Sequence, residues 1–168
     1  MSLATSKVHL LIDTANQTLD VYDGDELIKR FSVSTAKNGA GQLENTGCTP
    51  LGRHTIAQKI GGEYPMNAVF VGRVITGEIY HEELGCAHPD RDWILSRILW
   101  LDGCEDGVNK GKNADGVCDT FSRYIYIHGT PDTEPMGKPM SHGCVRMRNE
   151  DIVWLYDVVD VGTAVNIV

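Results

Sequence analysis

Short apolar stretches separated by turn residues run along most of the chain, and this spacing constrains the fold more than any other feature. Their β-branched and aromatic content predicts strands. Trp93–Leu101 would also fit a short core helix, but we favour a strand there. The expected strands are Val8–Asp13, Thr18–Tyr22 and Leu27–Thr35, which form an opening β-meander, then His54–Ile60, Val69–Ile75, Trp93–Leu101, Arg123–His128 and Ala164–Val168. The sequence therefore predicts a mostly β fold.

One amphipathic helix is expected near the C-terminus. Asn149 is suited to the N-cap, acidic residues follow it, and Gly162 supplies the stop. The apolar residues at helical spacing are Ile152, Leu155, Tyr156 and Val159. Two segments, 37–52 and 103–120, are rich in Gly and polar residues and are expected as loops, and the second is expected to form a wall of the site.

Length, composition and charge narrow the class of protein. A chain of 168 residues with 42% hydrophobic content suits a single domain, residues 1–168. The formal net charge of −8 opposes a polyanion, so nucleic acid is not expected as a partner. No apolar run approaches the roughly 18 residues of a membrane span.

The N-terminus bears on where the protein works. Residues 1–15 lack the basic and apolar regions of an export signal, so a cytoplasmic location is expected for the chain as it stands. Met1-Ser2-Leu3 is also typical of an expression remnant. If a leader has been removed there, the periplasm or cell envelope becomes the expected location.

The chain has five cysteines and no Cys-x-x-Cys pair, which argues against a redox motif or a zinc knuckle. An odd number leaves one thiol unpaired in a monomer. The other four could form two disulfides in three connectivities, but we expect them to be reduced, because further thiols endanger a free-cysteine enzyme in an oxidising compartment. The cysteines are Cys48, Cys86, Cys104, Cys118 and Cys144.

The densest chemistry lies in Ser141-His142-Gly143-Cys144-Val145-Arg146-Met147, with His128 sixteen positions before the cysteine. A thiol is only a few per cent thiolate at neutral pH, so a nearby imidazole is the usual activating group. Both His128 and His142 are candidates. His128 is expected at the C-terminal end of its strand, where Gly129 permits a sharp turn. An activated Cys144 is expected to react with alkylating reagents ahead of the other cysteines at neutral pH.

The neighbouring residues suggest further roles. The backbone N–H groups of Gly143 and Cys144 are placed to stabilise an oxyanion, and Ser141 can hold the loop by local hydrogen bonds. Arg146 either binds a substrate carboxylate or pairs with Glu150 or Asp151 as a fold contact.

Two other interpretations of the same residues stay open. Cys144 could be a small buried structural residue. Alternatively His128, His142 and Cys144 form an N/N/S ligand set that is chemically sound for zinc, although the chain lacks closely spaced ligand pairs.

The pattern of a histidine, an interval of about sixteen residues and Ser/Thr-His-Gly-Cys-x-Arg/Asn resembles the signature of the YkuD-type L,D-transpeptidase catalytic domain. The resemblance extends to the opening strand pair, Thr49-Pro50-Leu51-Gly52, Ile127-His128-Gly129-Thr130 and the closing helix and strand, and so covers nearly the whole chain. It implies a β-sandwich-like domain with a deep cleft and one or two short helices.

The resemblance also implies a substrate and residue roles. The substrate would be the stem peptide of peptidoglycan, with no metal and no cofactor. Cys144 would attack the bond between the L-centre and D-Ala of a tetrapeptide stem, and His128 would be the general base, its ring held by the carbonyl of Gly129. The N–H groups of His142, Gly143 and Cys144 would form the oxyanion hole. Tyr126, Ser141 and Arg146 would contact the substrate.

The fate of the resulting thioester defines the alternatives. Transfer to an amine gives a 3-3 cross-link or D-amino acid exchange, whereas transfer to water gives an L,D-carboxypeptidase of peptidoglycan recycling. A catalytically idle peptidoglycan-binding module is the alternative from another class. Within residues 77–120, where the resemblance is weakest, Arg91, Arg97 and the acidic loop are expected to shape or close an acceptor subsite.

Overall fold

The computed structural model describes residues 7–168, so the start Met1-Ser2-Leu3 and its bearing on a leader lie outside the described residues. The two helices of this range are α1 (Glu82–Ala87) and α2 (Asn149–Val158). Its strands are β1 (Val8–Asp13), β2 (Thr18–Asp23), β3 (Glu26–Ser32), β4 (Gly52–Ile60), β5 (Ala68–Val71), β6 (Val74–Ile79), β7 (Ile94–Gly103), β8 (Lys112–Asn113), β9 (Gly116–Val117), β10 (Tyr126–Thr130), β11 (Val145–Arg148) and β12 (Ala164–Ile167).

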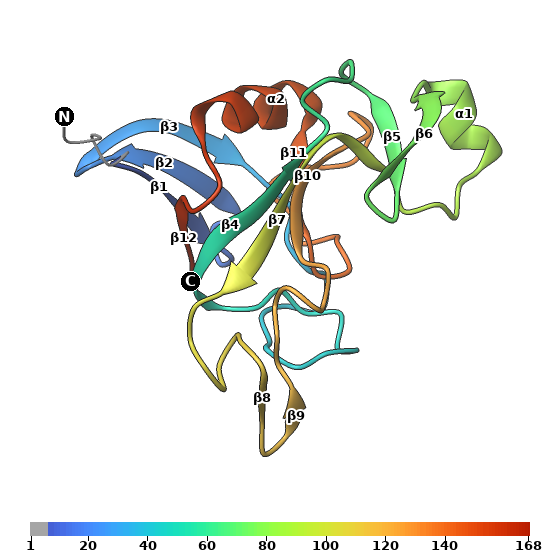
Figure 1. Ribbon diagram of the computed structural model, residues 1–168. Helices are drawn as coiled ribbons and strands as arrows, with labels where there is room; N and C mark the ends of the chain where they lie inside the picture. Colours follow the sequence, from blue (N-terminus) through green and yellow to red (C-terminus); the bar gives the residue numbers. More distant parts are fainter. Residues whose placement is uncertain (1–6) are drawn as a thin grey trace.

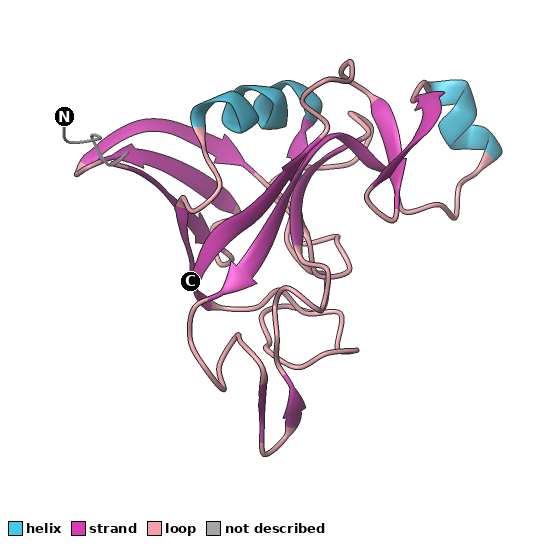
Figure 2. Ribbon diagram, viewed as in Figure 1, coloured by secondary structure: helices cyan, strands magenta, loops and turns pink. Residues whose placement is uncertain are grey.

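One sheet of ten strands forms the body of the molecule (Figure 1). Its main path runs β11-β10-β7-β4-β12-β1-β2-β3, and β5 pairs with both β6 and β7. The pairs β1–β12 and β10–β11 are parallel, and the other pairs along the path are antiparallel. Strands dominate the described chain, as Figure 2 shows, which confirms the prediction of a mostly β fold with short helices.

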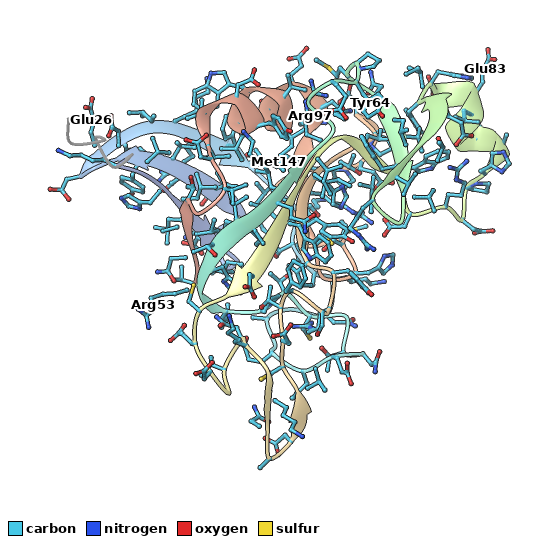
Figure 3. All side chains as sticks on the ribbon, in the orientation of Figure 1. Glu26, Arg53, Tyr64, Glu83, Arg97 and Met147 are labelled. Carbon is cyan, nitrogen blue, oxygen red and sulfur yellow. The ribbon has the colours of Figure 1, made fainter. Side chains whose placement is uncertain are left out.

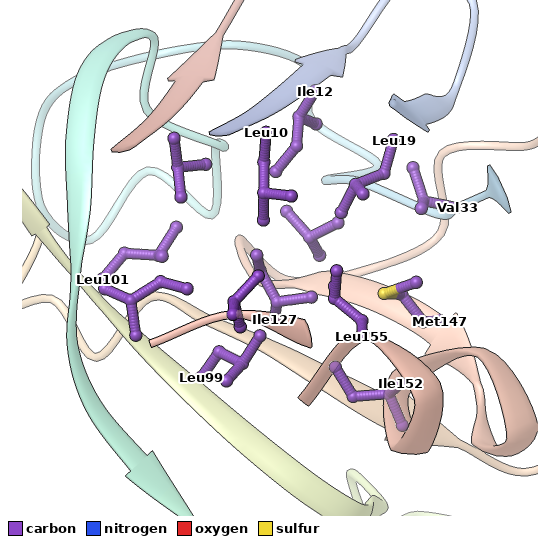
Figure 4. Packing of buried hydrophobic residues seen from close by; sticks show 14 of the residues in the cluster. Leu10, Ile12, Leu19, Val33, Leu99, Leu101, Ile127, Met147, Ile152 and Leu155 are labelled. Atoms are coloured by element: carbon purple, nitrogen blue, oxygen red, sulfur yellow. The ribbon is translucent and has the colours of Figure 1, made fainter. Parts of the chain in front are cut away.

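The sheet curls around one main hydrophobic core, so a sandwich-like packing arises within a single continuous sheet (Figure 4). Leu10 and Leu19 from the opening strands meet Leu99 and Ile127 from the opposite half of the sheet. Helix α2 adds apolar side chains to the same core. Complete burial of one such side chain contributes about 1.5–3 kcal/mol, so this cluster is the main source of the fold's stability.

The opening of the chain agrees with the sequence prediction. Strands β1, β2 and β3 pair antiparallel as an up-and-down meander. Residues 37–51, which precede strand β4, form a loop with isolated β-bridges and no regular strand or helix, as expected. Residues 94–103 form the strand β7 rather than a helix, and they lie between β4 and β10.

The predicted single strand Val69–Ile75 is wrong. The chain forms the hairpin β5–β6 instead, with a two-residue turn at Gly72 (φ 55°) and Arg73 (φ 66°). Two successive positive φ values are the geometry of the tight turns that connect paired strands. An arginine in this conformation gave no signal in the sequence, because glycine or asparagine normally marks such turns. Helix α1, which the sequence pattern did not locate, follows this hairpin with the His81 ring accepting a hydrogen bond from the Leu84 N–H.

Helix α2 begins one residue earlier than expected. Arg148 is the N-cap and makes no side-chain capping bond, whereas Asn149 is the first helical residue. The Asn149 amide is drawn inward because Ser96 and the Thr130 carbonyl satisfy it in the interior. The helix ends at Val158, before Gly162. Of the residues predicted to face the core, Ile152, Leu155 and Val159 are buried, and Tyr156 packs against them half-buried.

Strand β10 also differs from its prediction. It runs from Tyr126 to Thr130, so His128 lies in its middle and Gly129 does not turn the chain. The pairing of β10 with β7 shifts register between His128 and Gly129. A Cβ atom on Gly129 would lie 2.5 Å from both the Asn149 Oδ1 and the Leu95 carbonyl oxygen. Glycine is therefore required at this position for close packing.

Neither helix in residues 7–168 has the length and apolar character of a membrane-crossing helix.

Candidate active site

Cys144 and His128 come from neighbouring parallel strands. Cys144 immediately precedes β11, and the register pairs Ile127 with Val145 and His128 with Arg146. Residues that are sixteen positions apart in the chain thus meet at one end of the sheet. The spacing noted in the sequence reflects the loop that joins these two strands.

A cavity of about 250 Å³ opens beside this strand pair. Gly129 and Gly143 do not line it and take part through their backbone atoms. Sequence analysis did not single out five of the lining residues. Three of them directly precede β10, and Asp92 precedes β7, so only the fold brings them together. The lining residues are Asp92, Ile94, Arg123, Tyr124, Ile125, Tyr126, His128, Ser141, His142, Cys144 and Arg146.

The sulfur of Cys144 has two hydrogen-bond partners on the backbone that leads into β10. The Tyr126 N–H donates to Sγ at 3.3 Å, and the thiol donates to the Tyr124 carbonyl at 3.4 Å. Burial raises the pKa of Cys144 to about 12, an effect that the Tyr126 N–H opposes. The resting side chain is therefore a neutral thiol at physiological pH.

His128 is fully buried in the described structure, with its ring oriented by its neighbour. The distance from His128 Nδ1 to the Gly129 carbonyl oxygen is 2.6 Å. Because a carbonyl can only accept, Nδ1 carries the proton and Nε2 of the neutral ring keeps its lone pair. Burial lowers the pKa of His128, while the bond to Gly129 opposes this shift. The ring is therefore neutral at physiological pH, with a basic nitrogen available.

The loop before Cys144 is held by side-chain and backbone contacts. Gly143 adopts φ 138°, and a Cβ atom there would lie 3.2 Å from Ile125 Cδ1. The Ser141 hydroxyl donates to the Cys144 carbonyl at 2.5 Å and accepts from the Gly143 N–H at 3.3 Å. The backbone N–H groups of His142 and Cys144 make no hydrogen bond within residues 7–168. Those two donors are free to bind an oxyanion.

Arg146 has partners that the sequence did not predict. Its guanidinium lies 3.3 Å from Asp92 and 3.8 Å from Glu134, so neither Glu150 nor Asp151 is its ion-pair partner. The predicted fold contact with the first turn of α2 is wrong because the β11 backbone directs Arg146 to the cavity side. His142, whose side chain is 78% exposed, lies 3.9 Å from the same Asp92.

The described residues do not support the zinc interpretation. Among residues 7–168, no three His, Cys, Asp or Glu side chains gather closely enough to hold a metal ion. His142 is turned toward Asp92, so it does not complete a ligand set with His128 and Cys144. All five cysteines are unpaired in the structure.

The residues expected to shape a second subsite lie elsewhere. Arg91 forms an ion pair with Glu78. Arg97 donates to the carbonyls of Ser96 and of Tyr64, which is labelled near it in Figure 3. The loop 103–120 carries the small β8–β9 hairpin, which projects from the body of the molecule (Figure 1). None of these residues lines the cavity beside Cys144, so the predicted wall is wrong.

The arrangement is suited to nucleophilic acyl chemistry. A thiol, a neutral imidazole with a fixed tautomer and two free backbone N–H groups share one concave site. These three components supply a nucleophile, a proton acceptor and oxyanion stabilisation.

Comparisons with known proteins agree with the fold and the motif. The YkuD family, described as the L,D-transpeptidase catalytic domain, matches residues 7–167. Among curated proteins, the "Probable L,D-transpeptidase YbiS" of Escherichia coli (strain K12) is 50% identical over 48 residues, which cover 29% of this chain and 16% of that protein. The chain thus spans only a small part of that relative's length.

Solved structures of L,D-transpeptidases share the fold. An L,D-transpeptidase from Mycobacterium smegmatis superposes with a TM-score of 0.57 at 20% identity, covering 97% of this chain and 59% of that one. L,D-transpeptidase 3 from Mycobacterium tuberculosis gives a TM-score of 0.58 at 17% identity, covering 97% of this chain and 61% of that one. At these identities the likeness concerns the fold alone.

Proposed function

Because the chain belongs to the L,D-transpeptidase catalytic-domain family, we propose that it catalyses cysteine-dependent acyl transfer on peptidoglycan stem peptides. One observation carries the proposal: the thiol of Cys144, the imidazole of His128 and the unbonded N–H groups of His142 and Cys144 meet at a single cavity. This set provides every group that thioester formation requires.

In the acylation step, Cys144 Sγ attacks the carbonyl between the L-centre and the D-Ala of a tetrapeptide stem. The thiol proton passes to Nε2 of His128 as the S–C bond forms. Burial raises the pKa of the Cys144 thiol, so in the proposed step deprotonation accompanies attack. The rigid Nδ1–H bond to Gly129 keeps the acceptor nitrogen oriented for this transfer.

The tetrahedral intermediate would place its oxyanion near the N–H groups of His142 and Cys144. Each well-placed donor of this kind contributes about 3 kcal/mol to transition-state stabilisation. The intermediate collapses by breaking the C–N bond, and the D-Ala amine leaves with the proton held by His128. The product is a thioester on Cys144.

Deacylation would reverse the proton path. An amine or a water molecule attacks the thioester, His128 takes its proton, and the Cys144 thiol is restored. A side-chain amine of a neighbouring diaminopimelate gives a 3-3 cross-link, a free D-amino acid gives exchange, and water gives L,D-carboxypeptidase activity. The same residues of this chain serve all three outcomes.

Mass spectrometry with a tetrapeptide stem tests the proposal. The wild-type protein should release D-Ala and show an acyl adduct on Cys144, and Cys144→Ala should do neither. Addition of a second stem peptide distinguishes the acceptors, because a dimeric product indicates transpeptidation and a tripeptide indicates hydrolysis. Binding of the stem without any product from the wild type would instead favour the peptidoglycan-binding module.

A further inference from the structure

Arg123 lines the cavity beside Cys144 and is held rigidly there. One terminal nitrogen, Nη1, donates to the carbonyls of Gly41 and Gln42 at 3.3 and 3.0 Å, and the other, Nη2, donates to the Cys48 carbonyl at 2.7 Å. A guanidinium has five N–H groups, and three bonds to carbonyls leave two of them free for a ligand. Arg123 thus presents unused donors from a fixed position.

The charge of Arg123 has no counter-ion in the described structure. Within residues 7–168 no carboxylate forms an ion pair with it, and the electrostatic attraction of Glu44 is the smallest of the effects on its pKa. Arg146, which also lines the cavity, is in contrast paired with both Asp92 and Glu134. The charge of Arg146, which belongs to the sequence motif, is thus neutralised by carboxylates, whereas the charge of Arg123, which lies outside the motif, is not.

Partial burial makes this unpaired charge costly. Removal from water lowers the pKa of Arg123, which is the signature of a guanidinium whose lost hydration is not replaced by an anion. Backbone carbonyls supply partial negative charge but no net charge. An anionic ligand entering the cavity would therefore gain the attraction that the protein itself leaves unused.

The position of Arg123 relative to the sulfur points to the ligand. Arg123 directly precedes Tyr124, whose carbonyl accepts a hydrogen bond from the Cys144 thiol. We propose that Arg123 binds a carboxylate of the peptide substrate while the adjacent carbonyl is held at Cys144. This inference rests on the proposed function and names a specificity residue for it. Two carboxylates of a stem peptide are candidates, the C-terminal one of D-Ala and the side-chain one of diaminopimelate.

Amidated substrates test this proposal and distinguish the two carboxylates. We would measure kcat/KM for the tetrapeptide, its C-terminal amide and its diaminopimelate side-chain amide with the wild type, Arg123→Gln and Arg123→Lys. The wild type should prefer the free acid over one of the amides by about 10–100-fold, the usual effect of a charge-assisted hydrogen bond. Arg123→Gln should abolish that preference and Arg123→Lys should keep part of it. The amide whose penalty disappears identifies the carboxylate.

A matched control removes an equal charge elsewhere. Arg53, at the start of β4 (Figure 3), has a side chain that is 73% exposed and does not line this cavity. Arg53→Gln should retain the full preference for the free acid. Arg123→Lys keeps the charge near the loop carbonyls, so it provides a folded comparison if Arg123→Gln is unstable.

Two results would overturn the proposal. An unchanged acid-over-amide preference in Arg123→Gln and Arg123→Lys would mean that the guanidinium does not contact a carboxylate. Equal loss on all three substrates would mean that Arg123 only clamps the loop 41–48. If the wild type turns over none of the peptides, the proposed function fails first. In that case calorimetry measures binding of the three peptides to Cys144→Ala and to the double variant Cys144→Ala/Arg123→Gln. A preference for the free acid that is present in the first protein and lost in the second would support the role of Arg123 without any turnover.

Discussion

The backbone N–H of Tyr126 lies 3.3 Å from the sulfur of Cys144. Strand β10 therefore contacts the sulfur through its first residue and carries His128 two residues later. A donor aimed at the sulfur stabilises a thiolate more than a thiol, whereas the Tyr124 carbonyl, 3.4 Å away, accepts the thiol proton and favours the neutral form. The sulfur sits between a group that favours its charge and one that opposes it.

The first prediction concerns alkylation of the resting enzyme. Since burial raises the pKa of Cys144 to about 12, its thiolate fraction should grow about tenfold per pH unit between pH 8 and 10. The exposed Cys86 and Cys104 serve as internal controls in the same digest. Peptide mapping after brief iodoacetamide treatment measures each rate. This reverses the expectation from the motif alone, and preferential labelling of Cys144 at pH 7 would contradict it.

The second prediction concerns Asp92. Its negative charge raises the pKa of Cys144, so Asp92→Asn should lower that pKa and increase the alkylation rate of Cys144 at pH 8 by a few-fold. The effect should be modest because the Asp92 side chain is 50% exposed and screened by solvent. Asp25→Asn, in the turn between β2 and β3, removes the same charge far along the sheet and should leave the rate unchanged. Equal rates in both variants would show that Asp92 does not act on the sulfur.

Some of the site could be derived from residue order alone. The sixteen-residue interval between His128 and Cys144 is local information, because it reflects two adjacent parallel strands and their connecting loop. Arg123 and Asp92 gave no comparable signal. Arg123 is marked only by the absence of a counter-ion, and Asp92 reaches the cavity from the segment before β7, so both depend on tertiary packing.

The difference between local sequence information and tertiary packing also explains where the prediction of the fold was wrong. The opening meander was predictable because turn residues and alternating side chains agree there. The hairpin at Gly72–Arg73 was missed because an arginine occupies a left-handed position. The displaced start of α2 arose because Asn149 finds better partners in the interior than at the helix end. Gly129 was predicted to turn the chain because glycine is common in turns. Its role is instead to leave space for the Asn149 side chain and the Leu95 carbonyl.

The third prediction concerns the stability that Asn149 provides. Its side chain accepts from the Ser96 hydroxyl at 2.6 Å and donates to the Thr130 carbonyl at 2.8 Å, both in the interior. Asn149→Ala leaves these partners unsatisfied and should lower the free energy of unfolding by about 2–3 kcal/mol. Urea unfolding followed by tryptophan fluorescence measures the change. Asn38→Ala, which removes one exposed bond to the Thr46 carbonyl, should cost less than about 1 kcal/mol. A similar loss in the free energy of unfolding for both variants would contradict the larger contribution expected from the interior contacts.

The fourth prediction concerns acid sensitivity, because two buried histidines are held neutral. Burial lowers the pKa of both His54 and His128, so below the unfolded value of about 6.5 the unfolded chain binds more protons than the folded one. Their contribution to the free energy of unfolding is complete above that pH and falls as the pH drops through it, by up to about 1.4 kcal/mol per pH unit for each group.

Urea unfolding at steps between pH 7.5 and 5.5, above the range where most carboxylates titrate, measures the slope of the free energy of unfolding against pH. His54→Gln should remove about half of it, since the glutamine amide cannot take up a proton in either state. His88→Gln replaces an exposed ring and serves as the control variant. A slope that is the same in the wild type and in His54→Gln would mean that His54 is not the source of the acid sensitivity.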